Sequence, residues 1–291
     1  ADAGSGGTES AGTGTATGYS LHTFTTTGSA TLTFNAISAK LSGNISGANR
    51  LTINAAPGTL TLSGTNTHTG GTTISGGMVI AGLASTGSAG AVINGPFGTG
   101  TVTVQSGYTV DLKGYAVANA FNLSGAGISS NGALINSTST ALTLPGAVTL
   151  AADTTISSTG DLTLSGVITS STGGLALKNG GNYTLSNTSN ALGTIAATGV
   201  SSLTVTNGST LTVGTVNTIA GISSAGVISL TSNAIELNGN LTVTTSTTDG
   251  VSLLSKTYIK NTALSATTVN TQGGALIIAS NIDDATDGDT T

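Results

Sequence analysis

The residues best suited to bind a metal ion stand near the C-terminal end of the chain. Residues 282–291 read IDDATDGDTT and contain Asp283, Asp284, Asp287 and Asp289. Carboxylate oxygens are preferred ligands of Ca²⁺, and this spacing loosely follows that of calcium-binding loops. Because the segment lacks the bidentate glutamate of such loops, we weigh a calcium site at these four residues against a solvated acidic linker. No other cofactor is expected.

The remaining acidic side chains are too sparse for an obvious catalytic centre. Asp111 and Lys113 flank Leu112 and share one face of a strand. We expect a solvent-exposed ion pair there rather than a general acid–base pair. Asp153 and Asp161 are eight residues apart, too far to share one short strand and too few for a full coil of the repeat described below. Both are expected at the surface or in turns.

The histidines also predict no reaction centre. His22 and His68 are the only two, and the chain has no Cys. A metal site would require remote segments to stack by accident, so we expect incidental surface positions for both. None of the Gly-x-Gly patterns carries the Lys and the helix of a phosphate-binding loop. We therefore predict that the chain is not an enzyme. A polysaccharide-active β-helix enzyme stays as an alternative, which would need carboxylates clustered on adjacent coils.

The elements that position these residues are short strands with alternating side chains. In residues 58–64, Leu60 and Leu62 point to one face, whereas Thr59 and Thr61 point to the other. Gly, Asn and Ser between such segments supply turns. The sequence therefore predicts half-buried strands with hydroxyl groups outside. The same alternation occurs at residues 30–36, 58–64, 100–106, 160–166, 201–207, 209–215 and 239–245.

The strand-forming segments also repeat with a longer period along the sequence. Residues 41–66 align with residues 164–190, and in both segments two leucines stand 21 residues apart: Leu41 and Leu62, Leu164 and Leu185. A repeat of about 20 residues built from strands and turns is typical of a solenoid, in which each coil buries its inner side against its neighbours. We therefore predict an all-β fold, a β-solenoid whose slender core is lined by aliphatic side chains.

Composition excludes several classes of protein. Only 6% of residues are charged and the net charge is −5, with 6 Lys and Arg in total. Nucleic-acid binding needs a basic stripe, so no nucleic-acid partner is expected. The sequence contains no run of about 18 apolar residues, so it predicts no transmembrane helix.

Two surface features could be modified or bind an unusual ligand. Seven Asn-x-Ser/Thr sequons arise readily by chance in so polar a chain, so glycosylation stays open. Thr-x-Thr pairs raise ice binding as another class of function. It would need a flat, evenly stacked threonine surface, and the irregular spacing of the pairs argues against one. The sequons are at Asn44, Asn122, Asn136, Asn182, Asn187, Asn207 and Asn240.

One segment carries a family resemblance. Residues 58–82, GTLTLSGTNTHTGGTTISGGMVIAG, resemble the passenger-associated transport repeat of bacterial autotransporter passengers. His68 stands where that repeat usually has Tyr, and Met78-Val79 replace the usual Thr-Leu. Residues 164–194 resemble a degenerate second copy, and residues 209–245 are similar in texture to filamentous-haemagglutinin-type adhesins.

The resemblance implies a right-handed parallel β-helix that is exported to the extracellular space or cell surface. It implies a role in adhesion, aggregation or matrix building through a surface, glycan or cell-surface ligand that it does not identify. The outer-membrane secretion machinery would lie outside this chain.

We expect residues 1–20 to be a linker-like or edge segment, residues 21–282 the solenoid, and residues 283–291 an acidic tail or a linker to a missing C-terminal part. Two roles follow from this organisation. One is the stalk of a surface adhesin. The other is a subunit that self-associates end to end into an extracellular filament or sheath, because an uncapped solenoid end exposes unpaired strand edges.

Overall fold

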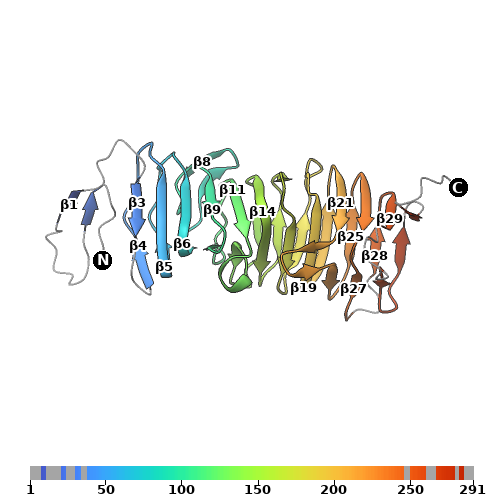
Figure 1. Ribbon diagram of the computed structural model, residues 1–291. Helices are drawn as coiled ribbons and strands as arrows, with labels where there is room; N and C mark the ends of the chain where they lie inside the picture. The colour runs from blue at the N-terminus through green and yellow to red at the C-terminus, as the bar shows by residue number, and fades with distance from the viewer. Residues whose placement is uncertain are drawn as a thin grey trace.

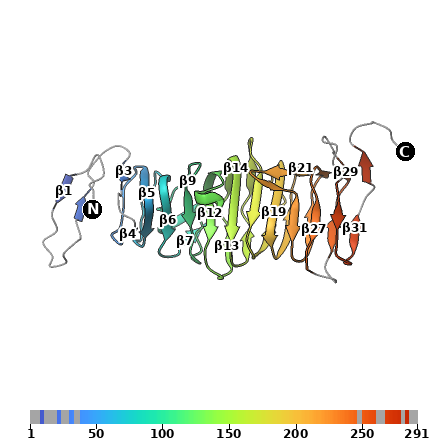
Figure 2. The same ribbon diagram turned by 60° about the horizontal axis from the view of Figure 1, so that its bottom comes forward.

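The chain winds into an elongated rod of stacked β-strands (Figure 1). The computed structural model describes residues 38–245, 250–259 and 267–278, together with four short strands at 8–10, 21–23, 30–33 and 282–284. Within these residues the helical content is one 3₁₀ turn, η1 (Ile128–Ser130). Figure 2 shows the same stack from a second direction, with successive strands side by side along the rod. The predicted all-β parallel solenoid is confirmed.

The strands stack in three parallel ladders that run along the rod. The first ladder joins strands in register from the blue end to the middle of Figure 1 and then continues, past a single bridge between Thr169 and Ala191, to the red end. Its strands are β3 (Ala30–Thr33), β5 (Leu51–Leu62), β6 (Thr72–Ala81), β9 (Val102–Val104), β11 (Phe121–Gly125), β14 (Val148–Ser158), β16 (Ile168–Ser170), β19 (Thr194–Val200), β21 (Thr210–Val213), β26 (Ala234–Leu237), β29 (Thr257–Ile259) and β32 (Ile282–Asp284).

The second ladder contains eleven strands among the described residues. The long strands β5, β6, β14 and β19 bend at a corner of the coil and so belong to both the first and the second ladder. The other members are β4 (Ser38–Leu41), β10 (Thr109–Asp111), β12 (Leu134–Asn136), β17 (Leu175–Lys178), β24 (Ile222–Ser224), β27 (Leu241–Val243) and β30 (Val269–Asn270).

The third ladder begins only at β13. Before it, the third side of the rod is made by irregular segments, such as the one in which Thr67 N donates to Ile45 O at 2.8 Å. The ladder comprises β13 (Leu142–Leu144), β15 (Leu162–Leu164), β18 (Asn182–Leu185), β20 (Ser202–Thr206), β25 (Ile228–Thr231), β28 (Val251–Leu253) and β31 (Leu276–Ile278).

Among the residues that the structure describes, three antiparallel pairs stand apart from the ladders. β1 (Thr8–Ser10) pairs with β2 (Leu21–Thr23), and β7 (Thr86–Ser88) pairs with β8 (Ala91–Asn94). β22 (Thr215–Val216) pairs with β23 (Ile219–Ala220), and this hairpin lies against the outside of the rod. There Val216 is fully buried against Ala176 and Ala196, and Asn217 Nδ2 donates to Thr155 Oγ1 at 2.8 Å.

The number of residues per coil varies because the connections between the strands differ in length, whereas the strands stay in register. In the second ladder, partner residues on successive coils are 19 residues apart between Leu60 and Val79 but 31 apart between Val79 and Val110. The β7–β8 hairpin accounts for the long coil. Strand registers therefore persist although the spacing in the sequence is uneven.

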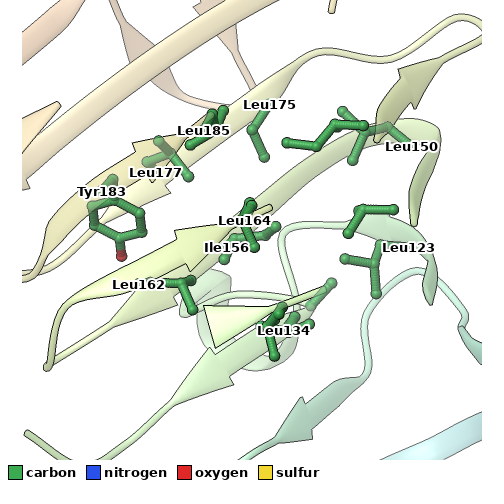
Figure 3. Close-up of a cluster of buried hydrophobic side chains, with 14 of the residues drawn as sticks. Leu123, Leu134, Leu150, Ile156, Leu162, Leu164, Leu175, Leu177, Tyr183 and Leu185 are labelled. Atoms are coloured by element: carbon green, nitrogen blue, oxygen red, sulfur yellow. The ribbon is translucent and has the colours of Figure 1, made fainter. Parts of the chain in front are cut away.

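The core is a stack of aliphatic side chains on the rod axis. Leu60 and Leu62 are both fully buried, as the alternation predicted. Figure 3 shows the layered packing around Leu162, Leu164 and Leu185, together with the one large ring among them, Tyr183. Its hydroxyl accepts a hydrogen bond from Ser158 N at 2.6 Å and donates one to the Lys178 carbonyl. The core can accommodate this ring because its hydroxyl group has a hydrogen-bond partner both as an acceptor and as a donor.

Buried asparagines tie the corners of neighbouring coils together. Asn190 Oδ1 accepts from Ile168 N at 2.7 Å, and its Nδ2 donates to Thr206 O at 2.9 Å, so one side chain joins two neighbouring coils. Asn207 makes the same kind of contact with Leu192, whose amide and carbonyl it both binds. These amides satisfy backbone groups at corners, where the ladders cannot.

The 21-residue repeat is real, but the two aligned segments lie on different sides of the rod. Leu41 pairs directly with Leu62, and Leu164 pairs directly with Leu185, so each spacing is one coil. The first pair belongs to the second ladder and the second pair to the third. Sequence periodicity therefore gave the coil length and not the position around the coil.

Candidate functional site

Rows of hydroxyl side chains run along the outer face of the third ladder. Thr163, Thr184 and Thr204 are direct register partners on successive coils. The row extends in register to Thr143 at one end and through Ser229 to Ser252 at the other. Since neighbouring strands lie about 4.8 Å apart, this third-ladder row offers a hydroxyl at each such step.

A similar row lies on the outer face of the first ladder. It is interrupted at Asn122, whose Oδ1 is buried and has no hydrogen-bond partner. Loops absorb the irregular spacing of this row, so its strands stay in register. Thr59 and Thr61, a Thr-x-Thr pair of the sequence, do not stack on threonine, since their partners on the next coil are Met78 and Ile80, as the irregular spacing predicted. The row consists of Thr52, Thr73, Thr103, Asn122, Thr149 and Thr169.

Asp111 is not half of a solvent-exposed ion pair, and that prediction is corrected. Its side chain is only 4% exposed. Oδ1 accepts from the backbone amides of Lys113 at 2.8 Å and Ser137 at 3.2 Å, while Oδ2 accepts from the Ser137 hydroxyl at 2.7 Å. The carboxylate thus braces the corner after β10, where Lys113 has a positive φ of 48°.

Asp153 and Asp161 are exposed, as predicted, and each binds the next coil. Asp153 Oδ1 accepts from Gly174 N at 2.8 Å. Asp161 Oδ1 accepts from the amide and the side chain of Asn182, at 3.0 and 2.9 Å. Ser202 continues this chain by donating to Asn182 Oδ1 at 2.7 Å. Both carboxylates therefore take part in hydrogen bonds along the surface of the rod.

His68 is the residue that sequence reasoning misplaced most. It was expected at the surface, yet it is 1% exposed in the connection between β5 and β6. Its Nε2 lies 2.8 Å from Thr72 Oγ1, and its Nδ1 is buried without a hydrogen-bond partner. Burial lowers the pKa of His68 below 6.5, and the Ile45 carbonyl offsets part of that effect. The position carried no signal in the strand pattern, because it lies in a turn.

The sequons divide by accessibility. Asn136 and Asn207 are buried and use their side-chain amides in the corners, so the folded rod hides them from a modifying enzyme. Asn44, Asn182 and Asn240 are exposed. Asn122 and Asn187 are half-buried, and glycosylation stays a prediction at all five positions that are not buried.

The calcium hypothesis falls mostly outside the described residues. Asp283 and Asp284 belong to β32, which pairs with β29, but their side chains are not described, and Asp287 and Asp289 lie outside the described residues. In residues 38–245, 250–259 and 267–278, no three His, Cys, Asp or Glu side chains gather into a metal site. His22 lies in β2, and its side chain is likewise not described. The boundaries expected at residues 20 and 283 stay predictions.

In the part of the chain that the structure describes, no helix is long and apolar enough to cross a membrane.

Comparison with known proteins gives one match. The family model of the passenger-associated transport repeat matches residues 57–81. This stretch covers the second half of β5, the turn with His68, and β6. No curated protein and no solved structure matches the chain. The repeat expected at residues 58–82 is thus confirmed, and a transport repeat inside a β-solenoid makes the chain similar to an autotransporter passenger.

Proposed function

We propose that this chain is the stalk of an exported bacterial surface protein, which holds adhesive or aggregating contacts away from the cell. The observation that carries the proposal is the transport repeat at residues 57–81, set within a continuous solenoid. The proposal places the chain outside the cell and assigns it no catalytic role.

The shape of the molecule supports a stalk. The second ladder alone has ten steps between its eleven strands, which at about 4.8 Å each gives a length of about 48 Å. Within each ladder a strand pairs with the strands of the adjacent coils, so length can be gained without a wider core. The surface is uncharged over long stretches, as the 6% charged content requires.

The experiment is surface labelling and adhesion in a bacterium that makes the protein. An antibody against the rod should label intact cells, and deletion of residues 38–278 should reduce cell aggregation or attachment. A cytoplasmic protein labelled in parallel controls for cell integrity. Labelling that appears only after lysis would contradict export, while unchanged aggregation and attachment in the deletion strain would contradict the adhesive role.

A self-assembling filament subunit is the second candidate. Leu276 faces the core in β31, yet it is 48% exposed, and the neighbouring Ile277 is 51% exposed. An apolar strand face that has no further partner strand among the described residues can be covered by the end of another copy. Electron microscopy of the purified chain separates the candidates: continuous fibres support the filament, and discrete short rods support the stalk.

Ice binding is a further candidate because the third-ladder row is in register. An even stack of threonines was the feature that the sequence did not predict, and it is present from Thr143 to Thr204. The test is thermal hysteresis of the purified chain, compared with a Thr163→Lys/Thr184→Lys variant. Equal freezing and melting points in the wild type would exclude this role.

A further inference from the structure

His68 joins two coils through a chain of hydrogen bonds. Thr72 Oγ1 lies 2.8 Å from His68 Nε2 and donates to Phe97 O at 2.9 Å. A threonine hydroxyl has one proton, and the Phe97 carbonyl can only accept. Thr72 must therefore accept from His68, which fixes the proton of the neutral ring on Nε2.

The other ring nitrogen makes no hydrogen bond in the folded state. Nδ1 is buried and unpartnered. Gly98 packs against that edge of the ring: a Cβ on Gly98 would lie 2.6 Å from Cε1 and 2.7 Å from Nδ1. Protonation would create a charge and a new donor at a buried site, and the Ile45 carbonyl offsets only part of the desolvation cost.

No nearby charge offsets the cost of protonating His68. Residues 42–50, 63–81 and 94–101, which carry the groups packed around His68, contain Arg50 as their only other titratable side chain. Arg50 is exposed, and guanidinium groups stay charged across the range considered. Any residual effect of a positive Arg50 would oppose a second positive charge.

The segment that His68 secures belongs to the long coil. Asn66 and Gly95 exchange backbone hydrogen bonds at 3.0 and 3.1 Å, and Thr99 N donates to His68 O at 2.9 Å. These contacts hold residues 95–99, which lead out of the exposed β7–β8 hairpin. We name residues 95–99 the strap.

We propose that His68 is an acid-sensitive latch, which holds the strap and the β7–β8 hairpin on the rod when neutral and releases them when it is protonated. This inference does not depend on the proposed function. The folded state keeps His68 neutral, whereas an opened strap exposes an ordinary imidazole. The open state therefore binds the proton more strongly, so the latch is fully closed above the ordinary pKa of 6.5 and weakens as pH falls below it.

The test is amide hydrogen exchange of the whole chain between pH 8 and pH 5.5, corrected for intrinsic rates. Below pH 6.5, the opening constant at the Asn66, Gly95 and Thr99 amides should rise by up to about tenfold per pH unit. The Leu203 amide, bonded to Val227 O, is the internal reference and should show no such rise. His68→Gln, which keeps a donor for Thr72 but does not titrate, should remove the pH dependence, while His22→Gln should keep it.

PH-independent opening of the strap in the wild type, or a dependence retained in His68→Gln, would overturn the latch. If His68→Gln does not fold, the NMR titration of His68 in the wild type decides. A midpoint below 6.5 supports the latch, and one at or above 6.5 refutes it.

Discussion

Removing one oxygen atom from Tyr183 should weaken the middle of the rod substantially. Tyr183 is fully buried, and its hydroxyl serves both Ser158 N and the Lys178 carbonyl. Tyr183→Phe keeps the ring, so no large cavity forms, but it leaves a buried donor and a buried acceptor unpaired. An unsatisfied buried group costs about 1–3 kcal/mol. With two such groups, we expect the free energy of unfolding to fall by about 2–6 kcal/mol.

The same hydroxyl predicts a dependence on alkaline pH. Burial raises the pKa of Tyr183 well above its ordinary value of 10.0, although the bonds to Ser158 and Lys178 partly oppose this rise. The folded state keeps the proton while the unfolded chain loses it, so this contribution to stability is complete below pH 10 and declines above it. The advantage of the wild type over Tyr183→Phe should therefore shrink as pH rises beyond 10.

The assay is urea unfolding followed by circular dichroism, at pH 8 and at steps up to pH 11. Tyr115→Phe is the matched control, because Tyr115 is 39% exposed and the chemical change is identical. It should alter stability by less than about 0.5 kcal/mol. A Tyr183→Phe variant as stable as the Tyr115→Phe control would refute the reasoning.

Three further substitutions test individual contacts. Asp111→Ala should lower the free energy of unfolding by about 1–3 kcal/mol because it removes three hydrogen bonds. Lys113→Ala should be nearly neutral. If urea unfolding shows equal effects for the two variants, the ion-pair interpretation is restored. Gly98→Ala should lower the free energy of unfolding by at least about 1–3 kcal/mol, because Gly98 has a φ of +72° and the new Cβ would lie 2.5 Å from His68 O. The control Gly43→Ala, whose Cβ would lie in open space, should not change stability in the same measurement. Val216→Ala should speed hydrogen exchange of the Gly221 amide, which bonds Gly214 O, without changing exchange in the third ladder; Ile93→Ala, at a side chain 65% exposed, should change neither.

The strands and the core could be predicted because their signal is local. Alternation placed Leu60 and Leu62 inside, and both are fully buried. The 21-residue spacing of Leu41 and Leu62 gave one coil correctly, because register partners on neighbouring coils face the same direction.

The corners could not be predicted, because no period applies to them. Asp111 and His68 are both polar residues at or near turns, and whether a turn points inward depends on the coils above and below. Asp111 is buried because Ser137, one coil further on, supplies donors. His68 is buried because the long coil returns over it at Phe97 and Gly98. Neither partner can be recognised from a single strand pattern.

The threonine rows show a related limit. Thr52, Thr73 and Thr103 are spaced 21 and 30 residues apart in the sequence, yet each is the register partner of the next in the structure. The hydrophobic core fixes strand register, and loops of any length can connect strands at modest entropic cost.

The central claim is that neighbouring coils stack in parallel register, and the absence of Cys from the chain allows a direct test. Thr184 and Thr204 are register partners, so their Cα atoms should lie about 4.8 Å apart, within the range of about 4.4–6.8 Å that a disulfide spans. Thr163 and Thr204 are two coils apart, at about 9.6 Å, which is too far. Under mild oxidation, Thr184→Cys/Thr204→Cys should form an intramolecular disulfide, detected by mass spectrometry, and Thr163→Cys/Thr204→Cys should not. Efficient cross-linking of the second pair with none of the first would contradict the stacked solenoid.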